Sequence, residues 1–323
     1  MKFDNVLVLG GSGFIGRHLV AELAKHGIGV TVPTRRRESA KHLTLLPTVD
    51  VVEADINAPG VIQGLARGKQ ALVNLVGILH GRRGLADERG PNDYGPDFAQ
   101  AHVELAQAAV AACRETGARR LLHMSAVGAA PDAPSEYLRS KGIAEKAVLA
   151  AEDLDVTLFR PSVVFGPEDS FLNLFACMAR FLPVLAIACP EARFAPVYVG
   201  DVVRAMATAL EDTGSRGKRY DLCGPRAYTL KELVEYVCAV TGRRRLVIGL
   251  PDGLSYLQAR LLELSPMPLM TRDNYYSMQV PSVCEGPFPF GIQPQALEAI
   301  APSYLAPHGP RERYPELRWR ARR

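Results

Sequence analysis

The sequence has no long hydrophobic run, a single tryptophan and little net charge. Its most apolar later stretch, residues 181–190, is interrupted by Pro183 and is far shorter than the ~20 residues that cross a bilayer. The formal net charge is only +4 over 323 residues, and before the last dozen residues no basic stretch carries interleaved aromatic residues. We therefore expect a soluble protein with no nucleic-acid partner.

The sequence also lacks any metal-binding pattern, because its six cysteines form no C-x-x-C pair and have no histidine at zinc-ligand spacing. We expect no metal site and predict that the cysteines are buried, reduced thiols. The first strand is expected to begin near Asn5, which leaves no room for a signal peptide, so a cytoplasmic location is predicted. The cysteines are Cys113, Cys177, Cys189, Cys223, Cys238 and Cys284.

What the chain does have is an ordinary globular composition, with 48% hydrophobic and 22% charged residues. Continuous apolar runs alternate with helical patterns, which is typical of strands buried on both faces of a parallel sheet. The alternation predicts an α/β protein with a Rossmann-type, doubly wound parallel sheet. The expected strands are 5–10, 29–34, 49–55, 71–77, 119–126 and 155–166, and the expected helices are 14–26, 59–67, 97–116 and 136–152.

The regular pattern ends at about residue 166. We assign 1–166 to a Rossmann domain and 167–323 to a smaller C-terminal region, some elements of which return to the Rossmann core. The elements expected there are a strand at 194–199 and helices near 201–211 and 229–241.

A glycine-rich turn, Gly10-x-x-Gly13-x-x-Gly16, joins the first strand to the first helix. Glycines at such a turn let a pyrophosphate approach the unpaired N–H groups at the helix N-terminus. The sequence therefore predicts a dinucleotide site, and a turn without a ligand is the alternative. The other turn residues expected at the cofactor are Ser12, Phe14 and Ile15.

Three arginines, Arg35 to Arg37, follow the second strand, where NAD-binding proteins usually carry an acidic residue. Guanidinium groups pair well with a 2′-phosphate, so Arg35 and Arg36 favour NADP(H) over NAD(H). A solvated loop is the alternative. Asp55 and Ile56, after the third strand, are placed to contact the adenine, although a strand-end aspartate needs no ligand.

Ser125, and then Tyr137-x-x-x-Lys141, complete a pattern that resembles the extended or atypical short-chain dehydrogenase/reductase superfamily. Residues 160–171, 196–202 and 270–278 are similar to the branch that contains the nucleotide-binding accessory subunit of respiratory complex I and its bacterial relatives. The resemblance implies that Tyr137 transfers a proton and that Ser125 holds the substrate oxygen.

Lys141 would lower the pKa of Tyr137 and bind the cofactor ribose. The resemblance also implies that Leu75, Val76, Gly77 and the residues from Pro161 through Val163 to Val164 line the cofactor. For several of these residues, packing in the hydrophobic core is the alternative role.

One residue departs from the superfamily pattern. His102 stands where active members commonly carry an asparagine that takes part in a proton relay. The histidine either carries a proton or water in its place or is a satisfied helix residue, and the second interpretation is the simpler one.

Three functions fit these residues. The first is an NADP(H)-dependent oxidoreductase acting on a small carbonyl, an alcohol or a quinone-related substrate. The second is a non-catalytic cofactor-binding subunit or assembly factor with a respiratory-complex or quinone-pathway partner. The third is a nucleotide-sugar epimerase or dehydratase, although we find no sugar-binding phrase after residue 166.

Three segments suggest contacts with other molecules. Residues 80–96 form either a lid over the ligand cleft or a plain surface insertion. The amphipathic stretch 253–266 and the basic tail 311–323 suit docking to a partner, and the tail also suits a membrane surface. A substrate-side helix and a solvated terminus are the simpler alternatives for these two.

Overall fold

The computed structural model of the protein describes residues 3–81, 93–265 and 268–306. The stretch 80–96 therefore lies mostly, and the basic tail 311–323 wholly, outside the described residues. Across the described ranges, no helix combines the length and the apolar character needed to span a membrane.

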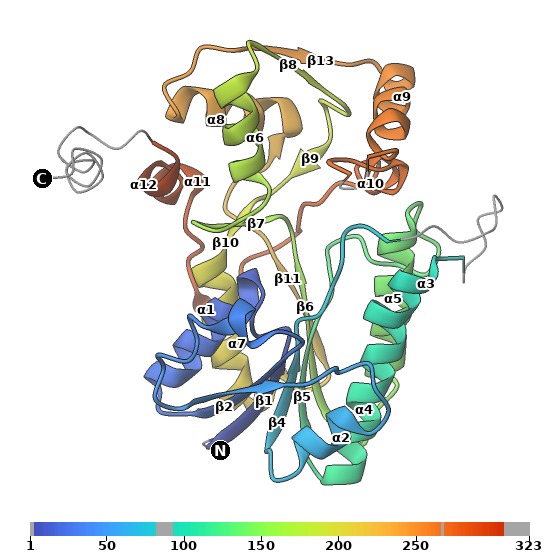
Figure 1. Ribbon diagram of the computed structural model, residues 1–323, viewed down its shortest axis with the longest axis vertical. Coiled ribbons are helices and arrows are strands. Elements are labelled where there is room, and N and C mark those ends of the chain that lie inside the picture. Colours follow the sequence, from blue (N-terminus) through green and yellow to red (C-terminus); the bar gives the residue numbers. More distant parts are fainter. Residues whose placement is uncertain (1–2, 82–92, 266–267, 307–323) are drawn as a thin grey trace, which may run out of the picture.

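Seven parallel strands form the central sheet in the order β11-β6-β5-β4-β1-β2-β3 (Figure 1). The strand order reverses between β1 and β4, which is where proteins of this fold bind dinucleotides. The predicted doubly wound sheet is confirmed. The strands are β1 (Asn5–Leu9), β2 (Gly29–Thr34), β3 (Val49–Glu53), β4 (Ala71–Asn74), β5 (Arg120–Met124), β6 (Asp155–Pro161) and β11 (Lys218–Leu222).

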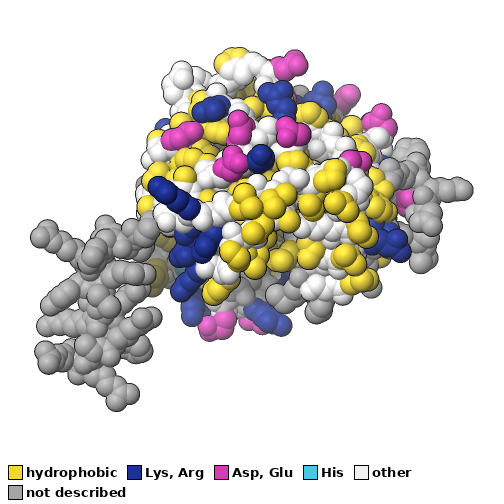
Figure 2. All heavy atoms as spheres, turned by 90° about the horizontal axis from the view of Figure 1, so that it is seen from above, with side chains coloured by type: hydrophobic (Ala, Val, Ile, Leu, Met, Phe, Trp, Pro, Cys, Tyr) yellow, Lys and Arg dark blue, Asp and Glu magenta, His cyan; other side chains and the backbone are white. Residues whose placement is uncertain are grey.

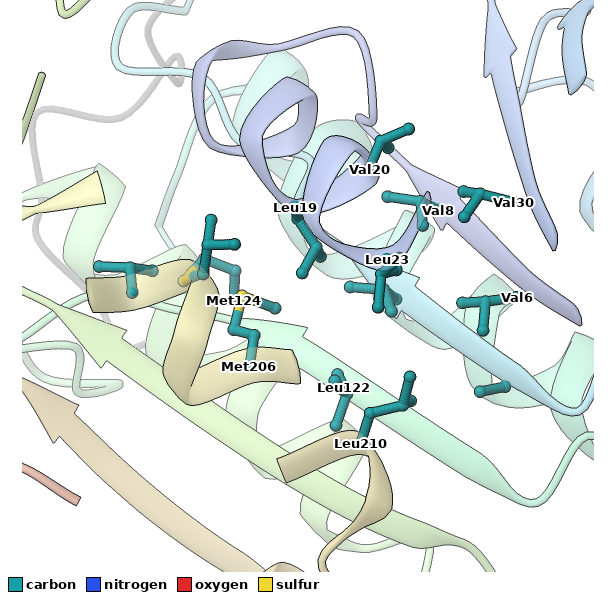
Figure 3. Packing of buried hydrophobic residues seen from close by; sticks show 14 of the residues in the cluster. Val6, Val8, Leu19, Val20, Leu23, Val30, Leu122, Met124, Met206 and Leu210 are labelled. Atoms are coloured by element: carbon teal, nitrogen blue, oxygen red, sulfur yellow. The ribbon is translucent and has the colours of Figure 1, made fainter. Parts of the chain in front are cut away.

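Helices cover both faces of this sheet. One face carries α1 (Phe14–Lys25) and α7 (Val199–Glu211), and Figure 3 shows Leu23 of α1 close to Leu210 of α7 over the strands. The other face carries α2 (Val61–Ala66), α4 (Leu105–Thr116) and α5 (Glu136–Leu149). Because both faces are covered, the apolar residues 6–9 of β1 are completely buried, as the continuous apolar runs predict.

The rest of the chain forms a smaller region, which lies above the sheet in Figure 1. It contains three two-stranded pairings: β10 with β7, β12 with β9, and β13 with β8. Its strands are β7 (Val164–Phe165), β8 (Val184–Ile187), β9 (Arg193–Phe194), β10 (Val197–Tyr198), β12 (Tyr228–Thr229) and β13 (Leu246–Gly249). Its helices are α6 (Leu172–Phe181), α8 (Leu230–Val240), α9 (Asp252–Leu262), α10 (Arg272–Ser277), α11 (Leu297–Ile300) and α12 (Pro302–Leu305).

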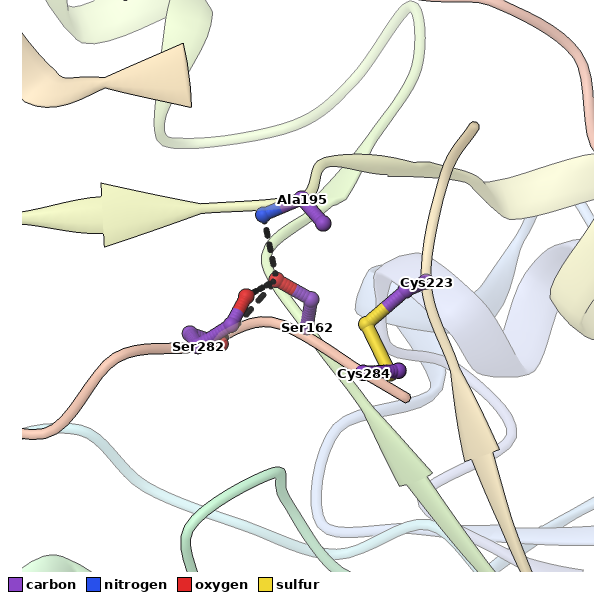
Figure 4. The surroundings of a disulfide bond; sticks show 5 residues. All are labelled: Ser162, Ala195, Cys223, Ser282 and Cys284. Atoms are coloured by element: carbon purple, nitrogen blue, oxygen red, sulfur yellow. Dashed lines mark hydrogen bonds between the residues drawn. A yellow bond between two sulfur atoms is a disulfide. The ribbon is translucent and has the colours of Figure 1, made fainter. Parts of the chain in front are cut away.

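The prediction that all six cysteines are reduced thiols is wrong for two of them. Cys223, directly after β11, forms a disulfide with Cys284, 61 residues later (Figure 4). Beside it, the Ser162 hydroxyl donates a hydrogen bond to the Ser282 carbonyl at 2.6 Å. The disulfide thus ties the edge of the sheet to a distant segment, a pairing that no local sequence pattern reveals. Of the remaining thiols, Cys113 and Cys238 are buried as predicted and Cys189 is half-buried, whereas the predicted burial is wrong for Cys177, which is exposed.

Candidate active site

The three glycines of the turn have different roles in the structure. Gly10 has a φ of 78°, and a Cβ there would lie 3.2 Å from the backbone of residues 75 and 76, at the end of β4. A Cβ on Gly16 would lie 2.2 Å from the Gly10 carbonyl oxygen, so this glycine allows α1 to pack against the turn. Gly13 is exposed, and a Cβ there would contact only the Gly10 oxygen, at 3.2 Å. The open side of Gly13 is therefore the side on which a ligand fits.

The N-terminus of α1 is suited to an anion. Its N-cap, Gly13, has no side chain to cap the helix, and the first turn contains no acidic residue. The helix dipole and the N–H groups of this first turn therefore favour a phosphate next to Gly13. Ser12 is half-buried in the same turn.

Arg35 and Arg36 follow β2 and are exposed, and neither side chain has an ion pair within the described ranges. The end of β3 lies beside them, because the Ala54 N–H donates to the Thr34 carbonyl at 3.0 Å. Asp55 is also exposed, and its Oδ1 accepts from the Asn57 N–H at 3.0 Å. The turn at Asp55 thus uses one carboxylate oxygen, and the other has no partner among the described residues.

Most of the apolar residues expected to line the cofactor also pack against the core. The partly buried ones are Phe14, Ile15, Ile56, Leu75, Val76, Val163 and Val164. Pro161 is buried. Gly77 differs, because it is exposed and a Cβ on it would lie only 3.1 Å from the Lys141 Nζ. The end of β4 therefore connects the glycine turn with the predicted proton-transfer residues.

Lys141 is buried and joins two strand ends. Its Nζ donates to the Val76 carbonyl at 3.3 Å and to the Met124 carbonyl at 3.1 Å. Burial lowers the pKa of Lys141 to about 8, against the opposing effect of Glu145. At pH 7 the ammonium is still mostly protonated, so a positive charge lies next to Gly77 and to the residue that precedes Ser125.

Ser125 immediately follows β5 and is 3% exposed. Its Oγ is buried, yet it has no hydrogen-bond partner among the described residues. Buried hydroxyls in proteins are almost always hydrogen-bonded, so an unpartnered one needs an explanation. A substrate oxygen placed at Ser125 would supply the missing partner.

Tyr137 and Lys141 stand four residues apart on α5, so their side chains share one face of the helix. The expectation that the lysine lowers the pKa of this tyrosine is wrong. Burial, followed by the charge of the Asp273 carboxylate, raises the pKa of Tyr137 to about 12. The phenol is therefore protonated at neutral pH, which suits the donation of a proton to a substrate oxygen and not its removal.

His102 is a satisfied residue, as the simpler interpretation predicts. It lies on a π-helical turn, η2 (Ala99–Glu104), and is 1% exposed. Its Nε2 accepts from the Ile78 N–H at 3.1 Å, and its Nδ1 lies 2.8 Å from the Ser140 hydroxyl, which itself donates to the Tyr137 carbonyl. This arrangement requires a neutral ring with its proton on Nδ1, in agreement with a pKa lowered to about 2 by burial and by Lys141. Because both ring nitrogens are engaged in these hydrogen bonds, His102 positions the neighbouring backbone and is not available to relay a proton.

Asp273, which the sequence analysis did not single out, reaches the same helix from α10. Its two carboxylate oxygens accept from the backbone N–H groups of Glu136 (2.6 Å) and Tyr137 (3.2 Å) at the N-terminus of α5. Burial raises the pKa of Asp273 to about 6, although the two hydrogen bonds oppose this shift. The available signal was its place inside 270–278, one of the stretches that carry the family resemblance.

A second missed pair supports the end of β4. The Asn74 Oδ1 accepts from the Val76 N–H at 3.1 Å, and the Asn74 Nδ2 lies 3.3 Å from Nδ1 of His123 on β5. Burial, followed by the charge of Lys141, lowers the pKa of His123 to about 3. This neutral pair holds the backbone of Val76, whose carbonyl accepts a hydrogen bond from the Lys141 ammonium.

Taken together, these residues fit a nicotinamide dinucleotide. Gly13 leaves room for a pyrophosphate, Gly77 and Lys141 lie at the switch point, and the Ser125 hydroxyl is unpartnered. When bound, such a cofactor supplies or accepts a hydride. The chain would provide a proton from Tyr137, a positive charge from Lys141 and a hydrogen bond from Ser125.

Comparisons with known proteins agree with this description. Residues 6–223 match the NAD dependent epimerase/dehydratase family. The chain is 30% identical over 312 residues to subunit 9 of the mitochondrial NADH dehydrogenase [ubiquinone] 1 alpha subcomplex of Rattus norvegicus. The aligned residues cover 93% of this chain and 79% of that protein. It is 33% identical over 250 residues to the ceramide reductase of Caulobacter vibrioides, covering 76% of this chain and 74% of the reductase.

Solved structures show the same fold. MoeE5 in complex with UDP-glucose and NAD aligns with a TM-score of 0.62 at 22% identity, over 77% of this chain and 85% of that one. The Thermus thermophilus UDP-glucose 4-epimerase in complex with NAD aligns with a TM-score of 0.61 at 22% identity, over 77% and 86% of the two chains. The resemblance found in the sequence is confirmed: the chain belongs to the NAD dependent epimerase/dehydratase family of extended short-chain dehydrogenases/reductases.

Proposed function

We propose that the protein is an NADP(H)-dependent reductase of a carbonyl or quinone-related substrate. The observation that carries this proposal is the buried, unpartnered Ser125 hydroxyl, next to the strand end that Lys141 holds. Tyr137 packs in the same cluster as Ala126, the residue after Ser125, and is kept protonated by burial. A protonated phenol is the form needed to deliver a proton to a carbonyl oxygen as it is reduced.

The similarity to a ceramide reductase supports reduction, whereas the similarity to a complex I subunit supports a second function, cofactor binding without turnover. One experiment separates them. The purified protein is analysed for a carried nucleotide, and NADPH oxidation is then followed across aldehydes, ketones and quinones. Tight NADPH binding without oxidation of NADPH by any of these substrates would favour the structural role. Activity confined to UDP-sugars would favour an epimerase.

The preference for NADPH is tested at the arginines after β2. In an Arg35→Ala/Arg36→Ala variant, the Kd for NADPH is expected to rise by about tenfold or more, because charge-assisted bonds to the 2′-phosphate are lost. The Kd for NADH should not change. Arg67→Ala, which removes another exposed arginine, is the matched control. Equal weakening of both nucleotides, or tighter binding of NADH by the unmodified chain, would contradict the preference.

The negative charge of Asp273 should appear in the pH profile of the reductase. Above pH 6 this carboxylate is ionised and raises the pKa of Tyr137, so it keeps the phenol protonated in alkaline solution. In an Asp273→Asn variant the alkaline limb of kcat is therefore expected to move to lower pH. Asp153→Asn removes an exposed carboxylate that is paired with Arg114, and should leave the profile unchanged. A lower rate with an unmoved alkaline limb would mean that Asp273 is only structural.

A further inference from the structure

The small region above the sheet exposes a continuous hydrophobic face. Figure 2 looks down on this region and shows hydrophobic side chains gathered into one patch, with Lys, Arg, Asp and Glu side chains outside it. The patch residues come from β8, β13 and α9, which lie together at this end of the molecule (Figure 1). We call these residues the leucine face: Val184, Leu246, Ile248, Leu254, Leu257 and Leu261.

The strand part of the face is a regular cross-strand array. β8 and β13 pair in parallel, with Leu246 opposite Val184 and Ile248 opposite Ala186. All four of these side chains are exposed, whereas Leu185 and Ile187 point into the core beneath. The ribbon of β8 and β13 therefore carries apolar side chains on both of its surfaces. The inner surface packs on the core, and the outer surface has no partner among the described residues.

The helix part is inverted relative to an ordinary surface helix. α9 contacts the protein through the small, buried Ser255 and Ala259, and its leucines at 254, 257 and 261 face outward. A surface helix normally buries its leucines and exposes small or polar residues. A hydrogen bond from Gln258 Nε2 to the Ala186 carbonyl, 2.9 Å long, fixes α9 beside β8, so the two parts of the face are continuous.

Arginines border the face where both strands begin. Arg180 lies before β8, and Arg243, Arg244 and Arg245 directly precede β13. The Arg245 Nε donates to the Ala179 carbonyl at 2.8 Å, which brings the two groups together. These three arginines and Glu235 line a hollow of about 500 Å³ next to the face.

We propose that the leucine face binds the surface of an anionic lipid bilayer, with α9 lying in the plane of the interface. Leucines beside arginines are the composition of interfacial amphipathic helices, in which apolar side chains enter the acyl boundary and basic ones meet anionic headgroups. Protein interfaces are instead enriched in tyrosine and tryptophan, and the leucine face contains neither. This inference does not depend on turnover at Ser125 and Tyr137.

The test is co-flotation of the full chain with vesicles, either of phosphatidylcholine alone or of phosphatidylcholine mixed with phosphatidylglycerol. We expect binding to the anionic vesicles that weakens as salt is added. A Leu257→Glu/Leu261→Glu variant should bind at least about tenfold more weakly, because it removes apolar area that enters the bilayer. Arg244→Glu should reduce binding to anionic vesicles only.

Two controls keep the result specific. Leu45→Glu changes a leucine that is 84% exposed between β2 and β3, far from the face, and should bind as the unmodified chain does. NADPH affinity and the molecular mass by light scattering should be the same in all variants. The proposal is overturned if the unmodified chain does not float, if it binds both vesicle types equally at every salt concentration, or if Leu45→Glu is equally impaired. A dimer that Leu257→Glu/Leu261→Glu dissociates would show that a second copy covers the face, and would also overturn it.

Discussion

Replacing Tyr137 with phenylalanine is expected to lower NADPH-dependent turnover by about 10²- to 10⁴-fold, the usual contribution of a positioned proton donor. The ring would remain in its contacts with Phe98 and His102, whose centroids lie 6.4 and 5.5 Å away. The backbone bond from Tyr137 to Asp273 is also unaffected. The loss should therefore appear in kcat, with NADPH affinity and thermal stability unchanged.

A matched variant controls for the loss of a phenol as such. Tyr220 of β11 stacks on Phe159 at 6.1 Å and packs against the cluster on the α1 and α7 face of the sheet, opposite α5. Tyr220→Phe should therefore leave kcat unchanged. If Tyr137→Phe retains full turnover, the proton comes from another group, and the assignment of Tyr137 as the donor is wrong. That result would leave the nucleotide site itself in place, because the glycine turn does not depend on Tyr137.

Replacing Gly16 with alanine should have the largest effect on the fold. The new Cβ would lie 2.2 Å from the Gly10 carbonyl oxygen and 2.6 Å from the Gly11 Cα. These are backbone atoms of a buried turn, so α1 would have to move away from β1. We expect a loss of about 3 kcal/mol or more in the free energy of unfolding, measured by denaturant titration, or no folded protein at all.

Gly13→Ala is the companion experiment, because the same methyl group is added to the open side of the turn. Its only neighbour within 4 Å would be the Gly10 oxygen at 3.2 Å, a single tight contact, so the protein should fold with a much smaller loss of stability than Gly16→Ala. NADPH binding should weaken strongly, since the methyl group occupies the space that we assign to the pyrophosphate. Unchanged NADPH affinity in Gly13→Ala, or unchanged stability in Gly16→Ala, would show that the roles of the two glycines are misassigned.

The strands of the main sheet could be predicted where the pattern is local. β1, β2 and β4 are mostly apolar runs that are almost completely buried, as expected of strands covered on both faces, whereas the edge strand β3 alternates and is partly exposed. β11 was not expected, because four of its five residues are exposed or half-buried and its sequence, KRYDL, is mostly polar. Among the described strands it pairs only with β6, at the edge of the sheet, and the 56 residues between β6 and β11 run through the smaller region and α7.

The candidate site likewise has one part that local sequence patterns predict and another that depends on tertiary packing. The sequence alone determined the glycine turn, the strand end at Ser125 and the common helix face of Tyr137 and Lys141, because sterics and helical periodicity act between near neighbours. Only the tertiary structure decided the protonation of Tyr137, since burial and a carboxylate 136 residues away set its pKa. The same holds for the disulfide between Cys223 and Cys284 and for the outward leucines of α9. Each depends on which distant segments pack together, and that information is not contained in any local pattern.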